Sequence, residues 1–532
     1  MMEKKNVKIW LPLLFSLTMI AGIFLGYRMQ GSMPGKSFFY IEKRRPVQEI
    51  LDLIDKKYVD NENMPALADT AIQAILSKLD PHSSFIPAEE LARVNEDING
   101  SFFGIGIEYS ILQDSLNVIN VLKNGPAEKA GLQTGDIILK ANDSLLSGKN
   151  ISPDKVRNTM RGPLDSKVKL DILRNHKAMQ ITLQRGIIPL SSVDAAYMMD
   201  GGTGYIRLNK FSSLTYREFM DALTGLKGKG MTKLILDLRN NGGGVLDEAV
   251  EIADEFLSGD KLITYTEGAH AAKNEYRCRR TGQFEQGELV VLADEGTASA
   301  SEILIGALQD WDRATVVGRR TFGKGLVQEQ FMLSDNSALR LTVARYYTPM
   351  GRSIQRPYDK GNLAYFEDYH KRFTNGELIY ADSIKNDTTQ LFITKGGKKI
   401  YGGGGISPDY FVAEDTGKAS AVITQFYIKG TLSDFGYRYL LANPSIKTRF
   451  STPAGFIQNF EPDAASWSLL KSLALKDSIK IEQLTDHEKT FIQKLIKSSI
   501  ARQLFRNEGY FEAINRQDPD VLKAIEIIKA GK

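Results

Sequence analysis

The sequence predicts a multidomain protein whose largest part is an α/β sheet domain, combined with a mainly-β domain and with helical modules at both ends. Three patterns lead to this fold class. From about residue 204, apolar strands alternate with amphipathic helices, which is typical of an α/β sheet. Between residues 102 and 187, short apolar runs are separated by Gly, Pro, Asn and Asp, as in a compact β domain. Residues 46–92 and 419–532 instead repeat apolar side chains at helical spacing.

Length and composition fit several folded domains. At 532 residues the chain exceeds the size, about 250 to 300 residues, at which a single core stops growing. With 42% hydrophobic and 25% charged residues, it is neither collagen-like nor disordered. A net charge of only +4, without a long basic run, argues against nucleic acid as a partner. We expect five segments: a cytoplasmic stub with a membrane-spanning helix (1–30), a helical module (31–95), the β domain (96–187), the α/β core (188–414) and a helical extension (415–532).

The N-terminus has the pattern of an export signal. Lys4, Lys5 and Lys8 precede an uncharged run from Ile9 to Tyr27. A helix over that run would span roughly 28 Å at about 1.5 Å per residue, close to the hydrocarbon thickness of a bilayer. Because lysines favour the cytoplasmic side, we expect a single-pass anchor in a bacterial inner membrane, with the rest of the chain in the periplasm. The alternative is secretion to the periplasm after cleavage of a signal peptide, although no typical cleavage site follows the apolar run.

The segments before the α/β core have simple patterns. Ile50 and Ile54 share one helical face within the N-terminal module, and Pro81 breaks the helical pattern. Cys278 is the only cysteine, so no internal disulfide can form. The apolar runs of the β domain are Asn117–Leu122, Asp136–Ala141 and Lys167–Leu173.

The α/β core is predicted from its alternating elements. Beyond the run Gly402–Gly405 the chain returns to helical spacing, and no motif assigns these last helices to assembly rather than to simple packing. The expected strands are Gly204–Leu208, Lys233–Leu238, Leu289–Ala293, Thr315–Val317 and Leu341–Ala344, and the expected helices are Tyr216–Lys227, Leu246–Leu257 and Ser299–Trp311.

One serine is placed where a nucleophile could work. Ser299 lies between the apolar run Leu289–Ala293 and an amphipathic helix, so it would stand at a helix start. There the unpaired N–H groups, including that of Ala300, and the positive end of the helix dipole favour negative charge on a reacting oxygen. A purely structural explanation stands beside this one, because Ser299 and Glu302 also have the spacing of a capping box.

A serine hydroxyl needs a base, and Lys324 is the best candidate. None of the five histidines lies in a Ser-rich or Gly-rich motif typical of a catalytic triad. Lys324 is flanked by Gly323 and Gly325, which would let it reach into a cleft. A lysine acts as a base only when neutral, so burial would have to lower its pKa from about 10.4 toward roughly 7 to 8. The alternative is an ordinary solvated turn.

Two other chemistries fit the motifs poorly. The segment Gly318–Lys324 has the spacing of a phosphate-binding loop, but Gly325 stands where Ser or Thr should bind Mg²⁺, and a strand-like run follows in place of a helix. No H-E-x-x-H or paired C-x-x-C motif occurs, which disfavours a zinc hydrolase. We expect neither a metal nor an organic cofactor.

An ordered series of motifs resembles the C-terminal processing (tail-specific) proteases, PDZ-containing serine peptidases of family S41 that use a Ser–Lys pair. The resemblance covers about residues 45–412 and implies an α/β protease core of the crotonase/ClpP-like type. The motifs are Leu79–Ser83, Phe103–Ile107, Gly125–Ala127, Ala130–Leu132, Gly135-Asp136, Asp237–Gly244, Thr297–Glu302, Thr321–Gln328, Leu339–Pro349 and Gly405–Asp409.

The resemblance assigns roles to particular residues of this chain. It implies Ser299 as the nucleophile, Lys324 as the general base and Gln328 as the residue that orients the lysine. The oxyanion hole would combine the N–H of Ala300 with an N–H of the Gly242–Gly244 turn, with Gly243 as the first choice and its neighbours left open. A glycine there would let the backbone approach the substrate carbonyl closely.

The β domain resembles the PDZ domain of that family, which implies binding of substrate C-terminal tails. An extended tail would pair with a sheet edge while amides of the Phe103-Gly104-Ile105-Gly106 loop bind its carboxylate. The implied partners are exported proteins with apolar C-terminal tails. A further copy of the chain or an activating partner could also bind, but no motif identifies either.

Two rival functions are weighed against an endopeptidase. The first is a PDZ adaptor that binds tails without cutting them, which would have no need of Ser299, Lys324 and Gln328 together. The second is acyl-CoA chemistry on a crotonase-like core, where paired amides hold a thioester oxyanion. The tail-binding domain and the export signal argue against it, because acyl-CoA is a cytoplasmic substrate.

Overall fold

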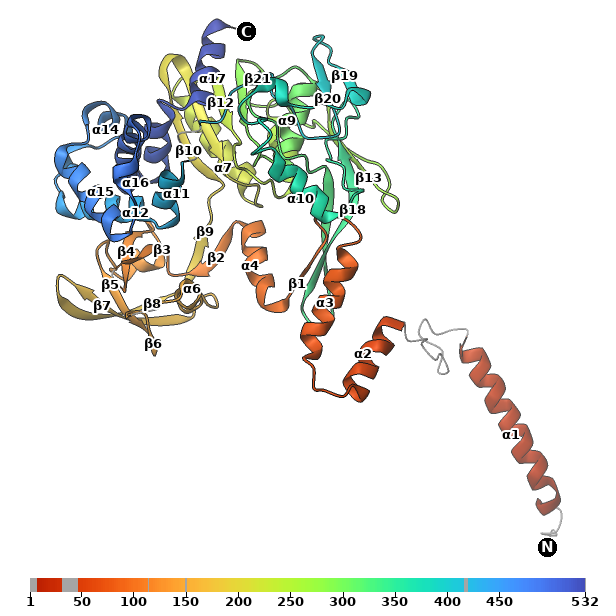
Figure 1. Ribbon diagram of the computed structural model, residues 1–532. Coiled ribbons are helices and arrows are strands. Elements are labelled where there is room, and N and C mark those ends of the chain that lie inside the picture. Colours follow the sequence, from red (N-terminus) through yellow and green to blue (C-terminus); the bar gives the residue numbers. More distant parts are fainter. Residues whose placement is uncertain (1–6, 31–45, 113, 149–150, 416–419, 532) are drawn as a thin grey trace. The chain divides into compact units, whose positions relative to one another are not determined.

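Figure 1 shows the computed structural model, which describes residues 7–30, 46–112, 114–148, 151–415 and 420–531. The chain divides into two compact units, residues 1–74 and 75–532. The first unit contains helices α1 (Val7–Gln30) and α2 (Pro46–Lys57) and most of α3 (Met64–Leu76).

The predicted membrane anchor falls only partly within the described residues. Lys4 and Lys5 lie outside them, as does the stretch 31–45 that follows α1. Among the helices of the described residues, none is both long and apolar enough to cross a membrane. The anchor over residues 1–30 therefore stays a prediction.

A six-stranded sheet forms the centre of the second unit. Its strand order is β10-β11-β12-β15-β16-β21, and every neighbouring pair is parallel except β10 with β11. The strands are β10 (Val193–Met198), β11 (Thr203–Leu208), β12 (Lys233–Asp237), β15 (Leu289–Ala293), β16 (Thr315–Gly318) and β21 (Tyr410–Phe411).

Helices cover both faces of this sheet, and the alternation of side chains along the strands supplies both cores. Leu234 and Leu236 of β12 belong to the core shared with α7 (Thr215–Gly228), α8 (Leu246–Asp254) and α9 (Ala300–Asp310). Ile235, between them, belongs to a second core shared with α17 (Pro519–Ala530), the last helix of the chain. The C-terminal helix is thus part of the α/β domain.

A second sheet of five antiparallel strands carries the segment after Lys324. β18 (Ala338–Tyr347) lies at its centre, pairing with β1 (Ser84–Ile86), β13 (Leu262–Glu267) and β17 (Leu326–Met332), while β14 (Asn274–Arg277) pairs with β13. Smaller elements are α10 (Asn362–Lys371), the hairpin β19 (Leu391–Ile393) and β20 (Lys399–Tyr401), and the 3-10 helices Asp200–Gly202, Ala381–Ser383, Thr388–Gln390 and Ile481–Gln483.

Strand β1 interrupts a segment for which the sequence predicted only helix and turn. Asp80 stabilises the turn that precedes β1, because its carboxylate accepts hydrogen bonds from the N–H groups of His82 and Ser83 and from the Ser83 hydroxyl. The same carboxylate accepts from the Thr342 hydroxyl of β18 at 3.1 Å. The turn after Pro81 is therefore held against the second sheet, which sequence periodicity alone could not reveal.

The mainly-β domain forms its own sheet, in the order β3-β4-β5-β7-β8, with β6 pairing β5. A separate pair, β2 with β9, brings together the two ends of the domain, next to α4 (Ala88–Asn99). The elements are β2 (Ser101–Gly104), β3 (Ile107–Leu112), β4 (Ser115–Val121), α5 (Pro126–Lys129), β5 (Ile137–Ala141), β6 (Ser144–Leu145), α6 (Pro153–Met160), β7 (Lys167–Arg174), β8 (Lys177–Gln184) and β9 (Gly186–Pro189).

The C-terminal extension is helical, as the sequence predicted. Its aromatic core includes Phe426, Phe435 and Phe456, all fully buried. The helices before α17 are α11 (Ala421–Ile428), α12 (Thr431–Ala442), α13 (Ile446–Arg449), α14 (Pro453–Asn459), α15 (Ala464–Lys476) and α16 (Asp486–Asn515).

Candidate active site

Ser299 stands between β15 and α9 in a strained backbone conformation. Its φ of 57° and ψ of −116° lie in a backbone region that residues other than glycine rarely adopt. Its carbonyl accepts hydrogen bonds from the Ile303 N–H at 3.0 Å and from the Tyr346 hydroxyl at 3.1 Å. The following residue, Ala300, is the first of α9, so its N–H has no acceptor within the helix. The sharp turn thus places a half-buried hydroxyl beside an available amide.

The glycine turn after β12 passes directly beside this serine. A Cβ atom on Gly243 would lie 2.7 Å from the Ser299 Cβ and 2.8 Å from the Ala300 nitrogen, and the φ of Gly243 is +91°. Both facts require glycine at this position. However, the Gly243 N–H donates to the Asn241 Oδ1 atom at 2.9 Å, so this amide is already engaged.

Because the Gly243 amide already has an acceptor, a neighbouring glycine is the alternative oxyanion donor, and the choice among the three glycines stays a prediction. Gly244 is exposed. Its nitrogen is bonded to the Gly243 carbonyl carbon, so it lies two bonds from the Gly243 Cα atom, which is near Ala300. The Gly242 nitrogen is four bonds from that atom. Of the two neighbours left open by the sequence, Gly244 is thus the better placed to share an oxygen with Ala300.

Lys324 lies in the loop between β16 and β17 and is half-buried. Its Nζ atom donates to the Gln328 Oε1 atom at 2.8 Å, and the Gln328 Nε2 atom donates to the His82 carbonyl at 2.5 Å. Burial lowers the pKa of Lys324 below its usual value, and the nearby positive charge of Arg340 lowers it further. Both effects favour the neutral amine that a base requires.

Glu302 joins the serine segment to the lysine loop. Its Oε2 atom accepts from the N–H groups of Ser299 at 2.8 Å and of Lys324 at 2.9 Å. Its Oε1 atom accepts from the Gly323 N–H at 2.7 Å and from the Thr321 hydroxyl at 2.5 Å. The side chain is fully buried, and burial raises the pKa of the carboxyl although these donors oppose the rise. The capping-box glutamate thus holds both reactive segments.

His82 contributes to the site through its main chain. Its ring Nε2 atom lies 3.1 Å from the Tyr365 hydroxyl, while burial, and next the charge of Lys324, lower the pKa of the ring to about 4. The imidazole is therefore neutral at physiological pH. Its carbonyl, not its ring, accepts from Gln328.

One cavity of about 530 Å³ collects most of the predicted site residues. Its apolar wall includes Leu246, Ile303 and Leu326, which suits an extended peptide better than a polar metabolite. The lining residues named by the sequence are Gly243, Ser299, Ala300, Lys324 and Gln328, and Arg340 and Tyr346 join them.

The four residues predicted to bind a tail lie elsewhere, at the start of the β domain. Phe103 and Gly104 end β2, and Ile105 and Gly106 lead into β3. The carbonyls of Ile105 and Gly106 accept hydrogen bonds within the domain, both at 2.9 Å. β3 is the terminal strand of its sheet, so one edge of that strand has no neighbour in the sheet.

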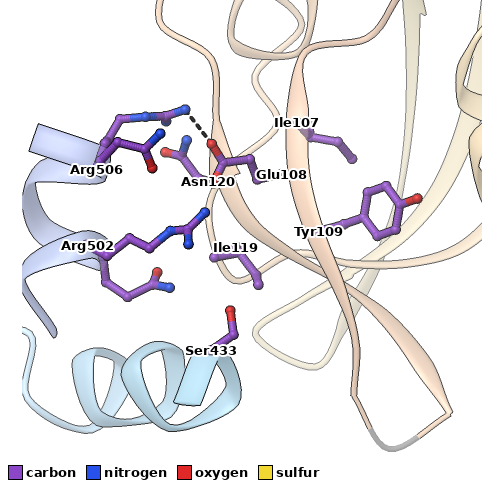
Figure 2. Close-up of a pocket in the computed structure, with 10 residues that line it drawn as sticks. Ile107, Glu108, Tyr109, Ile119, Asn120, Ser433, Arg502 and Arg506 are labelled. Carbon is purple, nitrogen blue, oxygen red and sulfur yellow. Dashed lines mark hydrogen bonds and ion pairs between the residues drawn. The ribbon is translucent and has the colours of Figure 1, made fainter. Parts of the chain in front are cut away.

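The face of β3 that carries Glu108 turns toward the C-terminal helices. Figure 2 shows Glu108 pointing toward Arg506 of α16, with which it forms an ion pair, while Ile107 and Tyr109 point the other way. A polar cavity of about 270 Å³ lies between these parts and includes Asn120 and Arg502 in its lining. The helical extension therefore contacts both the β domain and the α/β core.

Four contributors to the site were not predicted from the sequence. These are the Asp80 carboxylate, the His82 carbonyl, the Asn241 side chain and the Arg340 charge. All four lay within motifs that the resemblance had singled out, namely Leu79–Ser83, Asp237–Gly244 and Leu339–Pro349, but the resemblance gave none of them a role. Asn241 carried a further signal, since it directly precedes the glycine turn.

Comparisons with known proteins match two parts of the chain. Residues 202–360 match peptidase family S41, and residues 104–184 match the PDZ domain. The carboxy-terminal-processing protease of Bartonella bacilliformis is 36% identical over 313 residues, which cover 58% of this chain and 71% of that protein. A probable CtpA-like serine protease of Staphylococcus saprophyticus is 33% identical over 315 residues, which cover 59% of this chain and 63% of that protein.

The chain is also similar to solved structures. The photosystem II D1 C-terminal processing protease is 31% identical, with 58% of this chain and 88% of that chain covered and a TM-score of 0.33. The PDZ domain of the carboxy-terminal protease from Vibrio cholerae, in complex with peptide, is 28% identical, with 17% and 99% covered and a TM-score of 0.16.

The sequence matches confirm the predicted fold class, an S41 protease core of mixed α/β structure with an inserted PDZ domain. They also set aside the non-catalytic adaptor and the acyl-CoA enzyme. The chain belongs to peptidase family S41, the serine peptidases that include the carboxy-terminal-processing proteases.

Proposed function

We propose that this peptidase recognises the C-terminal tails of exported proteins through its PDZ domain and cleaves them with Ser299 and Lys324. One observation carries the proposal. Ser299 and Lys324 line the same cavity, and a single buried carboxylate, that of Glu302, bonds to the backbone N–H of each. Such a shared anchor would fix the relative position of the two reactive side chains.

The proposed reaction begins with a proton transfer. Neutral Lys324 takes the Ser299 hydroxyl proton while the oxygen attacks the carbonyl carbon of the scissile peptide bond. The N–H groups of Ala300 and Gly244 would stabilise the negative charge that develops on the carbonyl oxygen. The carbon–nitrogen bond then breaks, the leaving amine takes the proton from Lys324, and the acyl group stays on Ser299.

Deacylation follows the same route with water. Lys324 takes a proton from water, the hydroxide attacks the acyl carbon, and Ser299 recovers its proton as the new carboxyl terminus leaves. Gln328 would keep the Lys324 amine directed into the cavity, because its Oε1 atom accepts from that amine and its Nε2 atom is held by His82. The lowered pKa of Lys324 would increase the share of neutral amine that can act as a base.

Tail recognition would use the open edge of β3. An extended tail can add as a strand there, while amides of the loop over residues 103–106 bind its terminal carboxylate. Support comes from the position of β3 at the end of its sheet and from Ile107 and Tyr109, which point away from the C-terminal helices in Figure 2. Apolar tails would fit this surface best.

Export of the enzyme is proposed on the sequence alone, from the basic residues before the uncharged run Ile9–Tyr27. Fractionation of bacterial cells that produce the full chain tests it. Recovery in the membrane fraction, with digestion by protease added from the periplasmic side, would support the anchor. A shortened soluble periplasmic chain would support signal cleavage. A soluble cytoplasmic chain would contradict both.

The catalytic pair is tested with the purified full chain and an unfolded protein that ends in an apolar tail. We expect Ser299→Ala and Lys324→Ala each to lower kcat by about 10³-fold or more, because each removes a group that takes part in bond making or proton transfer. Lys399→Ala, which changes an exposed lysine, is the matched control. Undiminished cleavage by Ser299→Ala or Lys324→Ala would refute the assignment. Replacing the tail with acidic residues should reduce cleavage by the wild type.

A further inference from the structure

The last helix of the chain reaches a charged group next to the glycine turn. Asp518 is the N-cap residue of α17, and its Oδ1 atom accepts from the N–H groups of Asp520 and Val521. The same oxygen accepts from the Arg239 Nη1 atom at 2.8 Å, and the Asp520 Oδ2 atom accepts from that nitrogen at 2.8 Å as well. Two carboxylates of α17 thus converge on one guanidinium nitrogen.

The rest of the Arg239 guanidinium is held by Asp237, the last residue of β12. Its Nε atom donates to the Asp237 Oδ1 atom at 3.0 Å and its Nη2 atom to the Asp237 Oδ2 atom at 2.7 Å. Arg239 is 9% exposed and Asp237 fully buried. Burial alone would raise the pKa of Asp237, but Arg207 and Arg239 hold it below its usual value. The Arg239 Nη1 atom therefore depends on α17 for its buried partners.

Arg239 begins the segment that leads to the proposed oxyanion hole. Asn240 follows, and its N–H donates to the Asp294 Oδ1 atom at 2.8 Å. The Asn241 carbonyl then accepts from the Ala298 N–H at 2.9 Å, next to Ser299, and the Asn241 side chain accepts from Gly243. A displacement of Arg239 would thus reach both the glycine turn and the serine turn through a short chain of hydrogen bonds.

A second arginine connects α17 to the serine side. Arg319 lies 3.8 Å from the Asp520 carboxylate, and its Nε atom donates to Glu295 at 2.8 Å. Glu295 belongs to the stretch between β15 and Ser299. Asp520 therefore contacts arginines that hold the two loops on either side of the proposed oxyanion hole.

Helix α17 also docks through apolar side chains. Val521, Ala524, Ile527 and Ile528 are buried against the sheet and supply an apolar interface. Buried charges are costly unless paired, and burial raises the pKa of Asp520 even beside Arg239. Carboxylates at this interface therefore suggest a role beyond attaching the helix, namely fixing the direction of the guanidinium.

We propose that Asp518 and Asp520 are positioning residues for catalysis, which hold Arg239 so that the amides of Gly244 and Ala300 are aligned before substrate binds. This inference rests on the proposed function, in which these amides receive the developing oxyanion. Preorganised donors lose their effect when displaced, and a shift of about 1 Å can lower a rate by about 10²-fold. The C-terminal helix would thereby belong to the active site.

The test compares Asp518→Asn, Asp520→Asn and the double variant in the full chain. Asparagine caps a helix as well as aspartate does, so Asp518→Asn keeps the start of α17 while removing the charge. Glu526→Gln on the same helix is the matched control, because that side chain is 68% exposed. Steady-state kinetics on the tailed substrate, binding of an apolar tail peptide and thermal unfolding are measured for each.

We expect the double variant to lose between about tenfold and about a hundredfold in kcat, normalised to the folded fraction. KM and tail-peptide affinity should stay within about twofold, because the PDZ domain is untouched. The single variants should lose less, and their effects should not add, because each leaves one carboxylate on the same nitrogen. A purely structural role would lower the folded fraction but leave the normalised kcat unchanged.

A folded double variant with wild-type kcat would overturn the inference, as would a kcat loss matched in Glu526→Gln. If the double variant does not fold, the Asp518→Asn variant provides the test, because it retains the helix cap and one carboxylate. A reduced kcat at unchanged KM in that variant supports the proposal. A wild-type kcat overturns it. Failure of the proposed function would look different, since Ser299→Ala would then remain active.

Discussion

The two halves of the proposed catalytic pair reach the same cavity by different physical means. Ser299 is placed by its backbone, in a strained turn between a buried strand and a buried helix. Lys324 is placed by its side chain, through Gln328 and the His82 carbonyl, and its pKa is set by burial and by Arg340. The serine half is therefore local in sequence, whereas the lysine half depends on contacts from distant segments.

This difference shows where the pair is vulnerable. A local turn is fixed once its strand and helix form, so substitutions elsewhere should affect the serine only by shifting the loops beside it. A desolvated lysine responds to any change of charge or packing around it. Glu302 is the one residue described here that bonds to the backbone of both halves, so its substitution should disturb both at once.

Among substitutions outside the proposed Ser299–Lys324 pair, the largest effect is expected from Glu302→Gln. The amide keeps the shape of the carboxylate, but its NH₂ group cannot accept a hydrogen bond, so two of the four donors around it lose their acceptor. Each buried unsatisfied group costs about 1 to 3 kcal/mol, so two of them predict a loss of about 2 to 6 kcal/mol in the free energy of unfolding. Both reactive segments would shift, so kcat should fall by about 10²-fold or more. Denaturant unfolding and steady-state kinetics measure the two quantities.

The control for this variant is Glu367→Gln, which changes an exposed glutamate. Wild-type stability together with wild-type kcat in Glu302→Gln would show that the shared anchor is not needed.

The next effect concerns the lysine half alone. Gln328→Met removes the acceptor of the Lys324 amine and the donor to His82 while keeping a side chain of similar length. We expect kcat to fall by about tenfold to a hundredfold, because the amine loses its direction, with little change in KM. Gln390→Met serves as the control for loss of a glutamine away from the site. An unchanged kcat in Gln328→Met would show that Lys324 needs no such support.

The sequence predicted the parts of this site that lie in short local motifs. Ser299 could be found because a helix start after an apolar run is visible in the chain, and Lys324 because small residues flank it. The α/β alternation and the mainly-β domain follow from the spacing of apolar residues along the chain, whereas the PDZ character was implied by the resemblance. The matches to family S41 and to the PDZ domain confirm both parts of the fold.

Other parts of the site could not be predicted from the sequence, for physical reasons. The bond from Gln328 to His82 joins residues 246 positions apart and uses a backbone carbonyl, which every residue possesses. The engagement of the Gly243 amide depends on the rotamer of Asn241, so spacing could only narrow the oxyanion donor to one of three glycines. Asp518 and Asp520 lie at the start of α17, and only the packing of that helix brings them to Arg239.

A smaller effect, on stability, should separate the backbone strain at Ser299 from the role of its hydroxyl. Ser299→Gly and Ser299→Ala both lack the hydroxyl, so their stabilities can be compared without a difference in activity. A residue other than glycine in this conformation costs about 1 to 3 kcal/mol, offset in part by the greater freedom of glycine in the unfolded chain, about 0.4 to 1 kcal/mol. We expect Ser299→Gly to be more stable than Ser299→Ala by about 1 kcal/mol in denaturant unfolding. The opposite order would contradict a strained nucleophile.

The smallest effect, a shift in pH dependence, tests the charge environment of the lysine. Only neutral Lys324 can take a proton, so kcat/KM should rise with pH as Lys324 loses its proton. Burial is the main cause of the lowered Lys324 pKa, and the charge of Arg340 adds to it. Arg340→Gln removes that charge, so the pKa of Lys324 should rise and the midpoint of the activity profile should move to higher pH. Arg345→Gln, an exposed position on the same strand, should leave the midpoint unchanged. A shift of the Arg340→Gln profile to lower pH would mean that another group limits the rate, because removing a positive charge cannot make a lysine easier to deprotonate.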